Sequence, residues 1–155
     1  MKKSFNHLSQ PQVLASAISG TTVMTLFSYL LSDRANKNFR EPKLLGRLCY
    51  RLLPVTSKKN MLITGWVLHY LVGLLFAECY SLFWTGNQRA DVKTGMVLGG
   101  ISGFAAILIW KFTYALHPNP PLIDFTSFAL QLVIAHLLFG IFAAFGYNAG
   151  RRYST

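Results

Sequence analysis

Long apolar runs alternating with short charged segments are the dominant pattern of this chain. Four runs cover residues 11–32, 60–84, 94–116 and 125–147. A spanning helix needs about 20 predominantly apolar residues, and its backbone groups must be satisfied within the segment. The runs are too long for strands and lack a period of two. We therefore expect an all-α integral membrane protein, built as a bundle of four transmembrane helices.

The segments between the runs predict how the helices connect within a single domain, residues 1–155. The second connection is short and polar, which favours the second and third spans as antiparallel neighbours. The third connection, residues 117–121, contains three prolines, which fix φ and lack an amide donor. Asp124 then occupies the position of an N-cap for the fourth span.

The first connection, residues 33–59, is long and carries eight basic and two acidic residues. Within it, residues 41–53 predict an amphipathic helix, because their leucines fall on one arc of a helix. Lys43, Arg47 and Arg51 form a basic stripe on the adjoining arc. Two interpretations remain open. The helix lies in the headgroup plane of an anionic leaflet, or it packs on the bundle.

Composition and charge support a membrane protein and exclude a nucleic-acid-binding one. Apolar residues make up 52 % of the chain and charged residues only 13 %. The net charge is +10, but 14 of the 15 basic residues lie outside the apolar runs, as topology signals do. No nucleic-acid-binding motif accompanies them. The charge bias barely separates the two orientations, and we expect the first connection to face the cytoplasm.

Spans two and four share the pattern H-x3-G-x3-A-x2-Y, in which all but the alanine fall close to one stripe of a helix. Its members are His69, Gly73, Ala77 and Tyr80 in span two, and His136, Gly140, Ala144 and Tyr147 in span four. The pattern predicts a tandem repeat of two helices with a pseudo-twofold axis along the membrane normal. The two histidines would then face each other across that axis.

Small residues form ridges on spans three and one. Gly95, Gly99 and Gly103 recur every four residues, and Ser16 and Gly20 offer a matching ridge. Small residues let helix backbones approach closely in lipid. The ridges therefore predict either a dimerisation face or, more simply, tight packing inside one bundle.

Polar and titratable side chains at membrane depth are costly and therefore mark candidate sites. The candidate polar site consists of His69, His136, Glu78, Lys111, Tyr80 and Tyr147. For the histidines three interpretations stay open: hydrogen bonds across the bundle, a proton or ligand site, and axial ligation of haem b. Glu78 lies on the helix face opposite His69, and either lines a pathway or reaches towards Arg89 or Lys93. Lys111 is expected to snorkel to the interface.

The repeated H-x3-G pattern, Trp110 in a glycine-rich third span, and the turn opened by His117-Pro118 resemble the YagU-like group of small bacterial inner-membrane proteins. The stretch from Gly20 to Thr25 fits the opening of that group as well. The resemblance implies a multi-pass protein of the bacterial inner membrane. It implies no catalytic residues.

No motif of catalysis is present, and Cys49 and Cys79 form no CxxC pair, so we expect neither an enzyme nor a metal site. The leading functional prediction is a non-catalytic helix bundle in the lipid bilayer that associates with itself or with another membrane protein of the envelope. The alternatives are a carrier of protons, ions or a small ligand built on His69, His136 and Glu78, and a bis-histidine haem b protein.

Overall fold

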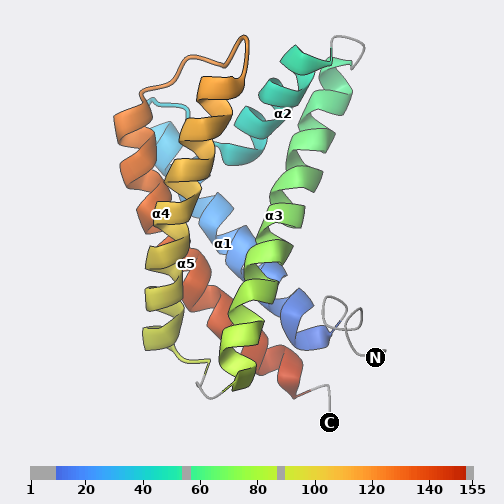
Figure 1. Ribbon diagram of the computed structural model, residues 1–155, viewed down its shortest axis with the longest axis vertical. Coiled ribbons are helices and arrows are strands. Elements are labelled where there is room, and N and C mark those ends of the chain that lie inside the picture. Colours follow the sequence, from blue (N-terminus) through green and yellow to red (C-terminus); the bar gives the residue numbers. More distant parts are fainter. Residues whose placement is uncertain (1–9, 54–56, 87–89, 153–155) are drawn as a thin grey trace.

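The structure is a computed structural model that describes residues 10–53, 57–86 and 90–152. Over these residues it forms five helices and no strand (Figure 1). The helices are α1 (Pro11–Ala35), α2 (Glu41–Leu52), α3 (Lys58–Gly86), α4 (Val92–Leu116) and α5 (Phe125–Arg151). The predicted all-α bundle is confirmed, with each long helix covering one apolar run and α2 covering the amphipathic segment.

The ends of the helices follow from local side-chain chemistry. At α4, Asp91 accepts from the backbone N–H of Thr94 (2.8 Å) while Thr94 Oγ1 accepts from the backbone N–H of Asp91 (3.2 Å). This reciprocal pair is a capping box. At α5, Asp124 accepts from the backbone N–H of Ser127 at 3.2 Å, which confirms the predicted N-cap. After α1, Asn36 adopts φ 50°, in the left-handed region in which a helix commonly stops.

Helix α5 is the centre of the bundle and packs closely against both α1 and α4. The glycine ridge of α4 faces α5: a Cβ added at Gly95 would collide with the Gly140 backbone, and one at Gly99 with the His136 backbone. On α1, Gly20 meets Phe139 and the hydroxyl of Ser16 donates to the carbonyl of Ala143 (2.9 Å). Both small-residue ridges are therefore in contact with α5, on different sides of it.

Helix α3 stands apart from α4, although the two are consecutive. Close backbone contacts of α3 are made with α1 and α2. Long side chains bridge α3 to α4: Tyr80 Oη bonds Ser102 Oγ (2.6 Å), and Trp84 Nε1 donates to Thr94 Oγ1 (3.2 Å). A strict twofold repeat would pair α3 with α4 as closely as α1 with α5, and the close contacts do not follow that pattern.

Helix α2 docks against the N-terminal half of α3 instead of extending away from the bundle (Figure 1). Gly46 lies against the backbone of Met61, and Gly65 lies against the carbonyl of Pro42. Leu44 and Leu48 are buried. Of the two interpretations of the amphipathic segment, these contacts fit the helix packed on the bundle.

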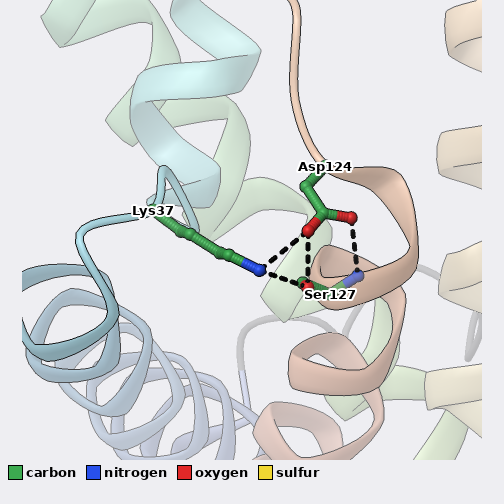
Figure 2. A network of polar contacts seen from close by, with 3 residues as sticks. All are labelled: Lys37, Asp124 and Ser127. Atoms are coloured by element: carbon green, nitrogen blue, oxygen red, sulfur yellow. Dashed lines mark hydrogen bonds and ion pairs between the residues drawn. The ribbon is translucent and has the colours of Figure 1, made fainter.

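Polar contacts join two parts of the chain. One part is α2 with the residues just before α2, and the other is the start of α5 with the loop just before α5. Lys37 Nζ donates to Asp124 Oδ2 (2.8 Å) and to Ser127 Oγ (2.7 Å), as Figure 2 shows. The bond from Lys37 and the bonds from Ser127 hold the pKa of Asp124 well below its usual range. At the other end of α2, Arg51 donates to the carbonyl of Asn119 (3.1 Å).

His117, in the prolyl turn, completes this attachment. Its Nδ1 accepts from the backbone N–H of Asn119 (3.0 Å), so in the neutral ring Nε2 carries the proton and donates to the Leu48 carbonyl (3.0 Å). His117 therefore caps one carbonyl of α2 from the loop that joins α4 to α5.

The surface of the bundle is more apolar than that of a water-soluble bundle. Four helices are long and apolar enough to cross a membrane. Large apolar side chains cover the outside; Phe104 and Phe112 of α4 are 67 % and 65 % exposed. Polar side chains are buried together with the apolar core: among them are Ser16, Thr21, Thr25, Ser28, Ser32, Glu41, His69, Gln131 and His136.

Candidate functional site

A small cavity lies where α2 inserts among the long helices, with a volume of about 90 Å³. Its lining residues come from α2, α3, α4 and α5, and are mostly apolar. They are Glu41, Leu45, His69, Val72, Phe76, Ala106, Ile109, Trp110, Thr113 and His136. Three titratable side chains therefore meet at one cavity: the Glu41 carboxyl and the His69 and His136 imidazoles.

Glu41 begins α2 and is 1 % exposed. Its Oε1 accepts from Ser28 Oγ of α1 (2.7 Å) and from Gln131 Nε2 of α5 (3.0 Å). Its Oε2 is buried and has no hydrogen-bond partner among the described residues. Desolvation by burial raises the pKa of Glu41 to about 7, against the opposing effect of the bonds from Gln131 and Ser28.

Gln131 and Ser28 connect this carboxyl to both neighbouring helices. Gln131 Nε2 also donates to Ser28 Oγ (2.5 Å), so the three side chains form a closed triangle across α1, α2 and α5. Neither partner is charged. The network therefore supplies no cation to offset the burial, and it is the burial that favours the protonated form of the carboxyl.

The hydrogen bonds assign the tautomer of each cavity histidine. Thr25 Oγ1 donates its one proton to the Thr21 carbonyl (2.6 Å), so it accepts from His69 Nε2 at 2.9 Å. His136 Nδ1 donates to the Leu132 carbonyl at 2.9 Å. Each neutral ring therefore keeps one nitrogen lone pair, on His69 Nδ1 and on His136 Nε2.

The rest of the predicted polar site does not meet at the cavity. Tyr80 and Tyr147 each lie eleven residues beyond their histidine, about 16 Å along a helix, and both contact the Trp84 ring. Glu78 is absent from the cavity lining, and its Oε2 is buried without a hydrogen-bond partner in the described chain. Lys111 is exposed near the end of α4.

Two basic residues were suggested as partners of Glu78, and the structure describes only one of them. Arg89 lies outside the described residues. Lys93 is exposed, and no ion pair joins it to Glu78 in the described part of the chain.

The basic stripe lies partly on the outside of α2. Lys43 and Arg47 are half-buried, while Arg51 is exposed. Lys43 and Arg47 line an open polar pocket at the start of α2, whereas Arg51 reaches the prolyl turn.

The dimensions of the cavity limit what it holds. Pockets for cofactor-sized ligands have volumes of about 300–1,000 Å³, and the cavity shared by the two histidines has about 90 Å³. A haem macrocycle does not fit between them without moving helices. Among residues 10–53, 57–86 and 90–152, no three His, Cys, Asp or Glu side chains are grouped as a metal site.

The sequence patterns above did not single out Glu41 as a site residue, although a signal was present. It lies three, four and seven residues before Leu44, Leu45 and Leu48, which places the carboxyl on the apolar arc of the amphipathic helix. A carboxylate on a buried arc needs a partner or a proton. Gln131, a polar side chain inside the fourth apolar run, was indicated by the sequence, whereas Ser28 and Thr25 gave no such signal.

Comparison with known proteins finds no match: no protein-family model, no curated protein and no solved structure matches the chain.

Proposed function

We propose that this chain is a four-span integral membrane protein that reversibly binds protons at the cavity formed by Glu41, His69 and His136. The membrane part of the proposal is supported by the apolar exterior. Contiguous exposed apolar surface of this extent is unstable in water, and lipid is the solvent in which it is favourable. The resemblance to YagU-like proteins favours the bacterial inner membrane.

One observation carries the proton-binding part: three titratable groups from three helices line a single small cavity. Titratable groups among spanning helices are rare and commonly belong to proton or ion pathways. A volume of about 90 Å³ suits a few water molecules, which need polar partners, and the carboxyl and the two ring lone pairs supply them.

Glu41 is the group whose charge changes near neutral pH. Below a pH of about 7 the carboxyl is neutral and its burial is compatible with the triangle formed by Ser28 and Gln131. Above that pH the ionised carboxylate is buried and forms no ion pair with a cation of the described residues, which is unfavourable in a medium of low dielectric constant. Deprotonation therefore disfavours the docked position of α2, because Glu41 is its first residue.

This function is one of binding, and it departs from the leading sequence-based prediction of an association module. The glycine ridge that motivated association is covered by α5. The site also differs from the predicted carrier site, since Glu41 takes the place given to Glu78.

Infrared difference spectroscopy tests the proposal on the protein reconstituted in lipid vesicles. A protonated carboxylic acid has a C=O stretch distinct from that of a carboxylate. We expect the wild-type protein to lose this band with a midpoint near pH 7, and Glu41→Gln to lack it. Glu78→Gln is the matched control and should keep the band. A band that survives in Glu41→Gln, or that titrates only below pH 5 (about the normal range of an exposed carboxyl), contradicts the proposal.

A further inference from the structure

A second pocket, open and polar, lies at the junction of α1 and α2 with a volume of about 330 Å³. Four of its lining residues are basic and one is acidic. The lining residues are Ser32, Asp33, Asn36, Lys37, Asn38, Arg40, Lys43 and Arg47. The pocket is separate from the Glu41 cavity, and the proposed proton binding does not use it.

The cations of this pocket exceed its anions. Arg40 pairs with Asp33, and Lys37 pairs with Asp124, which lies outside the lining. Lys43 and Arg47 form no ion pair with a described acidic residue. Arg40 Nε is buried and has no hydrogen-bond partner within the described residues. The pocket therefore combines two uncompensated cations with an unused guanidinium donor, which matches a phosphate anion.

An apolar groove begins where this basic pocket ends. The Arg40 guanidinium carbon lies 5.1 Å from the centroid of the Tyr29 ring. Tyr29 lines the next pocket, together with Trp66 and Tyr70. Its walls are almost wholly apolar, and its volume is about 300 Å³.

The groove continues along α1 and α3. A further apolar pocket of about 320 Å³ shares Tyr70 and extends to Leu14. Tyr29 and Leu14 are fifteen residues apart on α1, or about 22 Å at the rise of a helix. Half of the hydrocarbon core of a bilayer is about 15 Å thick. The groove is therefore long enough for an acyl chain that reaches the middle of the bilayer.

We propose that an anionic phospholipid occupies these connected pockets, with its phosphate at Lys43, Arg47 and Arg40 and one acyl chain in the groove between α1 and α3. Basic pockets beside spans bind anionic headgroups through charge, and an apolar groove alone does not select for charge. The order of the pockets, polar then aromatic then aliphatic, follows the order of headgroup, glycerol and chain in a phospholipid. The inference rests on the proposed membrane location but not on proton binding by Glu41.

Tryptophan quenching by brominated lipids tests this site, because Trp66 lines the groove and is 37 % exposed while Trp84 and Trp110 are buried. The full chain is reconstituted in phosphatidylcholine vesicles that contain a minor fraction of brominated phosphatidylglycerol or of brominated phosphatidylcholine with identical chains. We expect phosphatidylglycerol to quench at an about thirtyfold lower fraction, as charge attraction by two basic residues implies. Trp66→Phe should abolish that difference.

Two charge-matched variants separate a built site from general attraction. The double variant Lys43→Gln, Arg47→Gln should lose the preference for phosphatidylglycerol. Lys58→Gln, Lys59→Gln removes the same charge from exposed positions at the start of α3 and should keep it. The proposal is overturned if both double variants lose the preference for phosphatidylglycerol equally or if both keep it. It is also overturned if the wild-type protein shows no such preference.

A soluble-phosphate arm distinguishes the two sources of the anion. Inorganic phosphate or glycerol phosphate should leave quenching by brominated phosphatidylglycerol unchanged. If either displaces the lipid as effectively as unlabelled phosphatidylglycerol, the pocket is a site for soluble phosphate and the lipid proposal is wrong. The Lys43→Gln, Arg47→Gln variant should keep the infrared band of protonated Glu41, so failure here is distinct from failure of the proposed proton binding.

Discussion

At the scale of the residue, Glu41 decides the character of the cavity. A buried carboxylate without a cation costs several kcal/mol, whereas a protonated carboxyl with hydrogen bonds costs little. Ser28 and Gln131 bond to one oxygen of Glu41 and leave the other without a described partner. Burial therefore converts an ordinary acid into a group that takes up a proton near neutral pH.

The stability of the protein should depend on pH through this residue. The pKa of Glu41 is raised in the folded protein from 4.5 to about 7. Its contribution is therefore fully present below pH 4.5 and is lost as the pH rises through 7. At about 1.36 kcal/mol per pKa unit, the loss is roughly 3 kcal/mol. Thermal unfolding in detergent at a series of pH values measures it.

Glu41→Gln cannot ionise, so its unfolding temperature should vary less between pH 5 and pH 8 (about two units below and about one unit above the expected transition). Glu78→Gln, whose carboxyl lies outside the cavity, should keep the wild-type dependence. Identical pH profiles for the wild-type protein and Glu41→Gln would show that this carboxyl is not the titrating group.

At the scale of the element, α2 is held by close backbone contact on one side and by side-chain bonds at both of its ends. Gly46 and Gly65 allow the contact with α3. Lys37 precedes the helix and binds Asp124, and Leu48 and Arg51 bind the prolyl turn. A helix at the membrane surface would turn its apolar arc towards lipid, whereas Leu44 and Leu48 on the apolar arc of α2 are buried. Helix α2 is in this respect part of the bundle.

Replacing Gly65 should release α2 from α3. A Cβ at this position collides with the Pro42 carbonyl and lies 2.8 Å from the backbone nitrogen of Gly46. Overpacking of this kind costs about 1–3 kcal/mol. We expect Gly65→Ala to raise the rate at which Cys49 of α2 reacts with a maleimide by about tenfold, since 1.4 kcal/mol corresponds to that factor. The assay uses a Cys79→Ser background, because Cys79 is exposed.

Gly100→Ala is the control for this experiment. Its added Cβ would meet only Leu137 Cδ2, at an ordinary 3.8 Å. It should leave the labelling of Cys49 unchanged, and alanine is the better helix former by about 0.5–1 kcal/mol. Equal labelling of Cys49 in the two variants would mean that the contact at Gly65 does not hold α2.

At the scale of the whole molecule, the sequence predicts what depends on local composition. The length and hydropathy of each run predict the four long helices, and Asp124 predicts where α5 begins. The cavity depends on packing between distant segments. The H-x3-G pattern predicted that His69 and His136 share a site, but the separation of α3 from α4 and the insertion of α2 arise from contacts that no single helix encodes.

The glycine ridge illustrates the same limit. Its spacing on α4 predicts a face for close approach, and α5 occupies that face. The identity of the partner helix follows from the arrangement of the bundle. Glu41 was missed for a related reason: its position on the apolar arc of α2 becomes informative once α2 is known to be buried.

Four helices that cross the bilayer are the central feature we propose for this protein, and the sidedness of single cysteines tests it directly. In a chain free of Cys49 and Cys79, the exposed positions Arg34, Lys93 and Arg152 are replaced one at a time with cysteine. The variants are expressed in membranes and labelled with an impermeant maleimide. We expect Lys93→Cys and Arg152→Cys to react from one side and Arg34→Cys only from the other. Reaction of all three from the same side, or recovery of the protein in solution without detergent, would contradict a four-span membrane protein.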